Sequence, residues 1–452
     1  FMAMAGVAPL MLMLLLVVVV TILVVVVLPL LEPSRLPREW WDSENPFAPN
    51  LSLHVLDMLQ TSRLSVGAVP SDWFRVPSVS STPILVKVDA SRVFARTTPF
   101  FVSANLDWHK PSEQPPAWEH HSSAMTLNLN DSALELAASA LAPGLLRIGG
   151  SEGDDIVFDV ANDGCGPASG APQPVDPAFC LTAGRWRQLT SFAQRTGMRI
   201  VFGLNAVTFR PNRNLSAPLN FTNIAAFLSL TAREKLPGIY GFELGNELPL
   251  IPPRTCALDF RRLRALIDAL WPEAAARPKL IGNDLNPDEK YLRAFLPLVL
   301  GSVDALTYHN YAAKGGDISH AEFMSADYLD QGPAKAKGVV QAWKDIASAS
   351  GMQIWSGEIA SCWNSGQANW TDRFGDVFWY ADALAARAAQ NHSAFCRQTL
   401  VGGFYELLSR QTLAPNPDFY VALLFKRLMG TRVLRASVVG DAAEAKAEVE
   451  VE

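Results

Sequence analysis

Short apolar runs that end in polar residues recur along the body of the chain, and segments with helical periodicity separate them. The runs predict eight buried strands, at residues 101–107, 144–150, 199–205, 239–247, 279–284, 305–311, 353–358 and 399–407. Helices are expected between them, at residues 132–141, 183–196, 224–234, 256–270, 291–299, 333–348 and 374–389. This alternation favours an α/β fold of the (β/α)8 TIM barrel type. A doubly wound open sheet is the alternative, but the sequence lacks the Gly-rich phosphate turn that should follow its first strand.

The first 31 residues contain no charged side chain, and residues 10–31 are almost entirely Leu, Val, Ile and Met. A helix of these 22 residues spans about 33 Å, enough to cross a hydrocarbon layer of about 30 Å. We therefore expect a transmembrane anchor at residues 1–31, with a cleaved secretory signal as the alternative. Residues 32–83 are rich in Pro, Ser and Trp and are expected to form a juxtamembrane linker.

Two observations disagree about the side of the membrane on which the body lies. Arg35 and Arg38 follow the apolar segment, which by the positive-inside rule places the body in the cytoplasm. Six Asn-x-Ser/Thr sequons favour a lumenal or extracellular body instead, at Asn50, Asn130, Asn214, Asn220, Asn369 and Asn391. We follow the sequons and expect a single-pass membrane glycoprotein with a lumenal or extracellular body. Secretion after signal cleavage is the alternative.

Charge and cysteine content narrow the possible partners. The formal net charge of −6 argues against nucleic acid as a partner. The five cysteines form no C-x-x-C pair and no H-E-x-x-H motif occurs, so we expect neither a metal nor a cofactor. Cys165 and Cys180 bracket a loop rich in Gly, Pro and Ala, where a disulfide is expected in an oxidising compartment. Cys362 with Cys396 is a second possible pair.

The barrel is expected to occupy residues 84–430, although residues 84–88 alternate like a strand that belongs to a sheet outside the barrel. Residues 433–439 could supply a second such strand, after which the chain becomes a low-complexity acidic tail. Residues 431–452 are therefore interpreted as the start of an incomplete C-terminal β-sandwich followed by that tail.

Candidate chemistry lies at the predicted strand ends, where the loops of a barrel build its active site. Glu247 closes the fourth predicted strand and Glu358 closes the seventh. A single Glu at a strand end is more often a cap or an ion-pair partner. Two glutamates that face each other across a barrel mouth are the groups needed to cleave a glycosidic bond, one as acid and one as carboxylate. Their separation, which decides between retention and inversion, is left open by the sequence.

Several motifs resemble those of glycoside hydrolase family 79, the heparanase-like β-glucuronidases, over roughly residues 84–440. The resemblance rests on LLRIGGS at 145–151 with Asp154 after it, FGLN at 202–205, ELGNE at 243–247, YHNY at 308–311, WSGE at 355–358 and the segment 418–431. It implies a retaining double displacement with Glu247 as acid/base and Glu358 as nucleophile. Asn246 would bind the sugar 2-hydroxyl and Tyr311 would hold the nucleophile. The further substrate contacts implied are Asp107, Ser151, Asn205, His309 and Tyr405.

Departures from the family pattern bear on the substrate. Leu248 separates the acid/base from Pro249, and the loop after the second strand is acidic where animal heparanase is basic. None of the loops near the site carries the clustered Lys and Arg that a sulfated chain requires. We therefore expect a carbohydrate partner that contains glucuronic acid but is less charged than heparan sulfate, cleaved by endo or exo action. A barrel glycosidase of other sugar specificity and a non-catalytic carbohydrate-binding protein are the alternatives.

Overall fold

The computed structural model describes residues 85–110 and 122–439. The predicted anchor, the linker, Asn50 and the acidic tail from residue 440 lie outside the described residues. Within the described ranges, no helix has both the length and the apolar composition needed to cross a membrane. Residues 88–435 form one compact unit.

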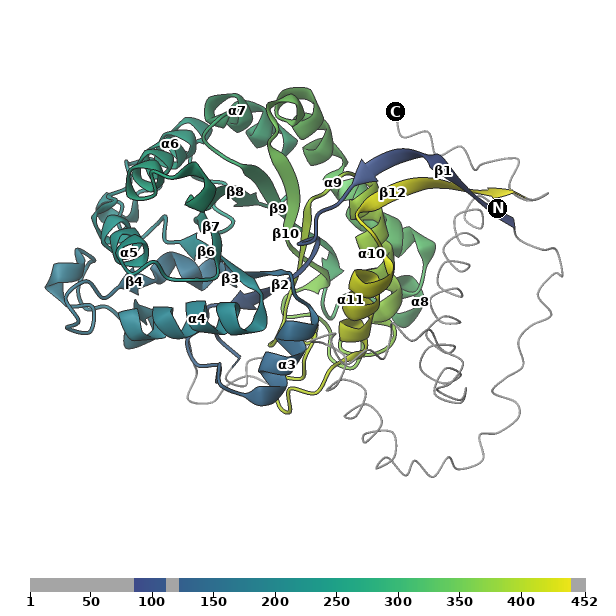
Figure 1. Cartoon of the computed structure of the whole chain (residues 1–452), viewed down its shortest axis with the longest axis horizontal. Helices are drawn as coiled ribbons and strands as arrows, with labels where there is room; N and C mark the ends of the chain where they lie inside the picture. The colour runs from purple at the N-terminus through teal and green to yellow at the C-terminus, as the bar shows by residue number, and fades with distance from the viewer. Residues whose placement is uncertain (1–84, 111–121, 440–452) are drawn as a thin grey trace. The chain divides into compact units, whose positions relative to one another are not determined.

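Eight parallel strands close into a barrel at the centre of this unit (Figure 1). In chain order they are β2 (Val102–Asp107), β3 (Leu145–Gly149), β6 (Arg199–Leu204), β7 (Ile239–Leu244), β8 (Lys279–Leu285), β9 (Ala305–Lys314), β10 (Gln353–Trp363) and β11 (Ala394–Arg397). Each strand pairs with the next in this order, and β11 pairs with β2 to complete the ring. The predicted (β/α)8 barrel is confirmed.

Helices surround the barrel on its outer side (Figure 1). They are α3 (Ser132–Ala140), α4 (Ala183–Thr196), α5 (Thr222–Arg233), α6 (Pro253–Leu270), α7 (Glu289–Val299), the short α8 (His320–Phe323), α9 (Ala326–Ile346), α10 (Asp376–Ala389) and α11 (Pro417–Leu428). The predicted helix at residues 333–348 is α9, which begins seven residues earlier at Ala326. Pro333 lies inside α9.

Helix α4 shows how local sequence sets these boundaries. The Thr182 side chain accepts the Arg185 N–H at the start of the helix, and Gly197 ends it with a left-handed φ of 73°. Between them, Trp186, Leu189 and Phe192 are buried at helical spacing. The amphipathic pattern therefore directs one face of α4 onto the barrel, where Trp186 packs against aromatic rings from neighbouring elements.

The barrel interior is apolar at one end and polar at the other. A cluster of buried residues lies at or near the start of six strands and comprises Leu145, Val201, Ile281, Ala305, Trp355 and Ala394. Polar and charged residues follow further along the same strands and are also buried, among them Arg147, His309 and Glu358. The apolar layer therefore closes the N-terminal end of the barrel and leaves the C-terminal end for a polar site.

The eighth strand was predicted at residues 399–407, and this prediction is wrong. The strand is β11, four residues that are all buried. In the predicted run, Gly402 and Gly403 take φ values of 105° and 73°, which turn the chain out of extended structure. The run contributes an isolated bridge between Val401 and Leu408. A buried strand this short has no distinctive pattern of its own, and pairing with β10 and β2 fixes its place.

Outside the barrel, β1 (Leu85–Arg96) and β12 (Arg432–Val439) form a two-stranded sheet. The sequence predicted a strand in each of these places, and β1 extends eight residues past the predicted end at Val88. These two strands are all that the described residues contribute to the expected β-sandwich.

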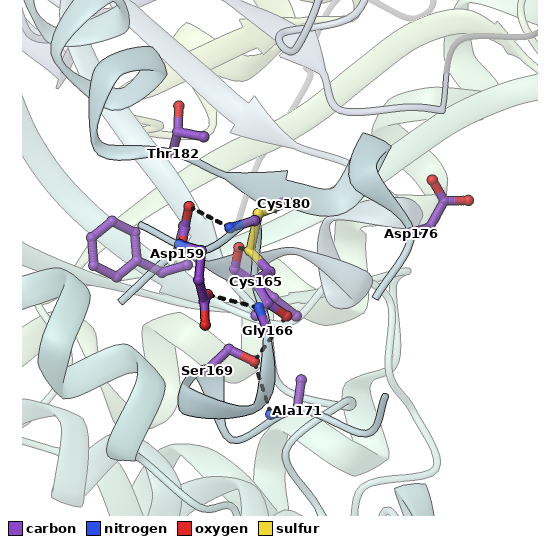
Figure 2. Close-up of a disulfide and its surroundings, with 12 residues drawn as sticks. Asp159, Cys165, Gly166, Ser169, Ala171, Asp176, Cys180 and Thr182 are labelled. Atoms are coloured by element: carbon purple, nitrogen blue, oxygen red, sulfur yellow. Dashed lines mark hydrogen bonds between the residues drawn. A yellow bond between two sulfur atoms is a disulfide. The ribbon is translucent and has the colours of Figure 1, made fainter. Parts of the chain in front are cut away.

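The predicted disulfide between Cys165 and Cys180 is confirmed, with the two Cα atoms 5.7 Å apart (Figure 2). It closes the long loop after β3, in which β4 (Val157–Phe158) pairs with β5 (Cys180–Leu181). The Asp159 carboxylate beside the disulfide accepts backbone N–H groups of Asp163 and Gly164 and holds the turn. Cys362 and Cys396 are free and buried, so the second possible disulfide does not form.

Candidate active site

A cavity of about 600 Å³ opens at the C-terminal end of the barrel strands. Residues at or just after seven of the eight strands line it, and β6 is the exception. Glu247 and Glu358 both lie on its wall. The alternation of strands and helices thus brings the two predicted carboxylates to one hollow, although 111 positions separate them in the chain.

Glu358 lies within β10, where the pairing register shifts between Ser356 and Ile359. Such a bulge re-aims a side chain, and here it coincides with the residue that enters the cavity. Gly357 is required at this point because an added Cβ would lie 1.9 Å from Thr307 Oγ1. The local sequence Ser-Gly-Glu therefore creates the irregularity that presents the carboxylate.

Two donors hold the Glu358 carboxylate. The Tyr311 hydroxyl donates to Oε1 at 2.5 Å, and Arg147 Nη1 donates to Oε2 at 2.8 Å. Burial alone would raise the pKa of Glu358, but the charges of His309 and Arg147 and the Tyr311 hydrogen bond lower it below its usual value. Glu358 is therefore kept ionised, as a nucleophile must be.

Glu247 lies beyond the strand that was predicted to carry it. Strand β7 ends at Leu244, and Gly245 and Glu247 then take left-handed φ values of 80° and 52° in a tight turn. The Glu247 N–H donates to the Asp284 carbonyl at 2.9 Å, which ties the turn to β8. One carboxylate oxygen of Glu247 lies within 4.8 Å of one of Glu358. A gap this small matches the separation of about 5 Å in retaining glycosidases and is below the 6.5 Å or more that inversion needs.

One ring nitrogen of His309 contacts the carboxylates of both glutamates. Its Nδ1 donates to Glu247 Oε1 at 2.8 Å and lies 3.8 Å from Glu358 Oε2, while Nε2 lies 3.4 Å from Asp284 Oδ1. Burial lowers the pKa of His309, but the Glu358 charge and the contacts with the Asp284 and Glu247 carboxylates together raise it to about 10. The ring is fully buried and does not lie on the cavity wall. The expectation that His309 contacts the substrate is therefore corrected: as an imidazolium it orients both carboxylates.

Arg147 lies at the centre of the buried charges. It donates to Glu243 at 2.7 Å, to Glu358 at 2.8 Å and to the Asn246 side-chain oxygen at 2.9 Å. Burial raises the pKa of Glu243 to about 8 despite the nearby Arg147. An Arg in the middle of the apolar run Leu-Leu-Arg-Ile is a signal for such a network, because a buried charge needs partners.

Asn246 is fixed on three sides. Its side-chain oxygen accepts from Arg147, its amide nitrogen donates to Ser151 Oγ at 3.3 Å, and its backbone N–H donates to Asp154 Oδ2 at 2.9 Å. Asp154 also accepts the Ala206 N–H at 2.7 Å and is buried, which raises its pKa to about 7. The acidic loop after β3 thus has a structural task, since Asp154 joins it to the loops that follow β6 and β7. No local sequence pattern indicates this role of Asp154.

A further group of polar residues lines the cavity near β2 and β11. Gln398 Nε2 donates to Asp107 Oδ2 at 2.6 Å and lies 3.5 Å from the Tyr405 hydroxyl oxygen. Burial and the Glu358 charge raise the pKa of Asp107 to about 7. Asp107, Ser151 and Tyr405 lie on the cavity wall where the resemblance placed substrate contacts, and Gln398 is an additional member that sequence reasoning missed.

Asn205 does not belong to this site. Its amide nitrogen donates to the Ile156 carbonyl, and its oxygen accepts the N–H groups of Val207 and Thr208. It is buried and absent from the cavity wall. The expectation of a substrate contact is therefore corrected: Asn205 caps the turn after β6, a role that Asn commonly takes in loops.

Glu247, His309 and Glu358 also bring three potential metal-ligand atoms within 4.8 Å of one another. The His309 ring nitrogen Nδ1 is already 2.8 Å from Glu247 Oε1, in a hydrogen bond within this group. Arg147 already forms an ion pair with the Glu358 carboxylate. These residues are organised as a hydrogen-bonded ion network, and the barrel, the close carboxylate pair and the ionised nucleophile define the class of retaining barrel glycoside hydrolases.

The chain belongs to glycosyl hydrolase family 79. The model of the family's N-terminal domain matches residues 83–385. Heparanase-like protein 3 of Arabidopsis thaliana is 30% identical over 359 residues, covering 75% of this chain and 66% of that protein. Baicalin-beta-D-glucuronidase of Scutellaria baicalensis is 28% identical over 397 residues, covering 79% of this chain and 72% of that protein. The chain thus spans 66% and 72% of the lengths of these two relatives.

A solved structure gives an independent comparison of the fold. The GH51 arabinofuranosidase from Xanthomonas axonopodis pv. citri superposes with a TM-score of 0.58 at 13% identity, covering 79% of each chain. At this level of identity the likeness concerns the barrel architecture alone, which many glycosidases of different specificity share.

Proposed function

We propose that this protein is a retaining β-glucuronidase of heparanase type. The observation that carries the proposal is the close approach of Glu247 and Glu358, with carboxylate oxygens within 4.8 Å at the mouth of a barrel. Membership of family 79 and the activities named for its relatives support glucuronic acid as the sugar.

In the first step, Glu247 donates its proton to the glycosidic oxygen while Glu358 attacks the anomeric carbon. The bond to the leaving group breaks and a covalent glycosyl–Glu358 ester forms. In the second step, Glu247 takes a proton from water, the hydroxide attacks the anomeric carbon, and the ester bond to Glu358 breaks. Two inversions at one carbon give net retention.

The surrounding residues support these steps in distinct ways. Tyr311 and Arg147 hold the Glu358 carboxylate in place and ionised before attack. His309 keeps Glu247 oriented through the 2.8 Å contact. Asn246 is positioned to bind the 2-hydroxyl, a contact that strengthens as positive charge develops at the ring. Asp107 and Gln398 are proposed to bind further hydroxyl groups, and Tyr405 the carboxylate of the sugar.

The cavity favours a lightly charged substrate. Along the part of its wall that the structure describes, Lys335 is the one cation. Its Nζ donates to the carbonyl oxygens of Tyr311 and Ala312 at 3.0 and 2.6 Å, so two of its three hydrogens are already used. A heavily sulfated chain needs several Arg or Lys side chains for its sulfate groups. A glucuronide joined to a neutral leaving group is therefore the proposed substrate class.

The test compares hydrolysis of aryl β-D-glucuronide, β-D-glucoside and β-D-galactoside by the purified protein. We expect the highest kcat/KM for the glucuronide, and proton NMR should detect the β-anomer of glucuronic acid first. Glu358→Gln should abolish turnover while leaving the melting temperature close to that of the wild type. Preference for an uncharged sugar would reject glucuronidase specificity, and an α-anomer as first product would reject retention. Unchanged turnover in Glu358→Gln would reject catalysis by this pair.

We also propose that the barrel resides in a lumenal or extracellular compartment. The Cys165–Cys180 disulfide supports an oxidising environment, and the sequon asparagines within the described residues are all exposed, at Asn130, Asn214, Asn220, Asn369 and Asn391. Loss of mass on treatment with an N-glycosidase would support this location, and an unglycosylated protein from secretory-competent cells would contradict it. The membrane anchor stays a prediction.

A further inference from the structure

The two catalytic glutamates divide the cavity wall into two unequal parts. Around the closed ring, β8 and β9 lie between β7, which precedes Glu247, and β10, which carries Glu358. The other arc runs through β11, β2, β3 and β6. The hydrogen-bonding groups proposed for the sugar come mainly from this second arc, namely Asp107, Ser151, Gln398 and Tyr405. The cavity wall formed by β8, β9 and β10 is therefore the part that can contact the leaving group of the substrate.

On that side, Trp363 is the last residue of β10 and lies on the cavity wall. Its exposed fraction is 48%, whereas Trp108, Trp186 and Trp355 are each at most 2% exposed. A large aromatic ring left open beside a cavity is a ready contact surface for a ligand, because covering it removes apolar area from water.

A lysine on the neighbouring strand contacts the indole of Trp363. Lys314 is the register partner of Trp363 on β9, and its Nζ lies over the ring, 5.6 Å from the centroid. Lys314 thus supports one face through a cation–π contact. Trp363 nevertheless remains 48% exposed, and the pyrrolidine ring of Pro287 adds apolar surface elsewhere on the same wall.

The side chains on this part of the cavity wall offer few positive charges to a leaving group. Lys335 is the cation among the described lining residues there, and Tyr311 and Ala312 already engage it through their carbonyl groups. The other polar members on this side are neutral amides, Asn286, Asn310 and Asn364. The wall therefore combines an exposed aromatic ring with neutral hydrogen-bonding groups.

We propose that Trp363 forms a leaving-group subsite, in which an uncharged ring next to the cleaved bond stacks on the exposed indole. The inference rests on the proposed glycosidase function and adds to it the class of leaving group. The face of a pyranose and that of an aryl group offer the same flat apolar surface, so either source is compatible with the subsite. Trp363 is a specificity residue, since it does not touch the reacting atoms.

The experiment compares kcat/KM of the wild type, Trp363→Ala and Trp363→Phe on three β-glucuronides. The leaving groups are 4-methylumbelliferone, a neutral monosaccharide and methanol, the last of which has no ring. Using each substrate's ratio of variant to wild type cancels the difference in leaving-group reactivity. Tyr420→Ala is the matched control, because Tyr420 is 47% exposed on α11 and lies away from the cavity wall.

We expect Trp363→Ala to lower kcat/KM about tenfold or more on ring-bearing substrates, mainly through KM, and less than threefold on the methyl glucuronide. Trp363→Phe should retain part of the preference and Tyr420→Ala all of it. A loss confined to the aryl or to the disaccharide substrate identifies the source of the ring.

An equal loss on all three substrates would overturn the inference, because it would mean that Trp363 positions Glu358 rather than binding the leaving group. Unchanged ratios would also overturn it. If the wild type cleaves glucosides instead of glucuronides, the proposed sugar specificity fails. The ratios of kcat/KM between Trp363→Ala and the wild type are then measured on aryl and methyl β-glucosides, which tests the leaving-group subsite independently of the sugar. Absence of turnover on every glycoside overturns both.

Discussion

Removing the Tyr311 hydroxyl tests how the nucleophile is kept ionised. In Tyr311→Phe, Glu358 Oε1 loses the donor that lies 2.5 Å away, while Arg147 still holds Oε2. Hydrogen bonds to charged groups contribute about 1.5–3 kcal/mol, which corresponds to about a 10- to 100-fold loss in kcat/KM. The same energy favours the protonated carboxyl group, so the pKa of Glu358 should rise by about one to two units.

The assay is the pH dependence of kcat/KM, whose acid limb reports the ionisation of essential groups in the free protein. Because the Tyr311 hydrogen bond lowers the pKa of Glu358, its removal should move the acid limb to higher pH. Tyr308→Phe is the matched control on the same strand. Its hydroxyl lies 2.8 Å from His392 Nε2 and has no contact with Glu358 among the described hydrogen bonds. An unmoved acid limb in Tyr311→Phe, or an equal shift in Tyr308→Phe, would refute the reasoning.

Three further predictions concern charge and stability. Asp107, with a pKa raised to about 7, ionises beside Glu358 as pH rises, so kcat/KM for an anionic glucuronide should fall above pH 7. Asp107→Asn should move this alkaline limb upward, and an unmoved limb would contradict the assignment. Arg147→Met leaves the buried, ionised Glu358 carboxylate without its Arg147 ion pair and should lower the free energy of unfolding by about 3–5 kcal/mol in chemical denaturation. Because 15 positions separate Cys165 from Cys180, replacing both with Ser should cost about 3 kcal/mol under non-reducing conditions, and an unchanged denaturation midpoint would contradict this.

The sequence by itself determined the barrel and the two glutamates at its C-terminal mouth. Buried parallel strands and amphipathic helices carry different periodicities, and these are properties of neighbouring residues. The same local logic predicted Glu247 at the end of one strand and Glu358 at the end of another, and it placed the disulfide across a loop rich in turn residues; the strand before Glu247 ends at Leu244 instead. Where the local signal was short, as in the four buried residues of β11, the prediction shifted to a longer run that Gly402 and Gly403 bend away from a strand.

Only the tertiary structure decided what the buried polar residues do. His309 could have been a ligand on the cavity wall, but contacts to Glu247 and Asp284 place it beneath the carboxylates. Arg147 meets Glu243 and Glu358 across 96 and 211 positions of sequence. The physical reason is that pKa values and carboxylate separation depend on charges and burial supplied by distant strands, which no local pattern records.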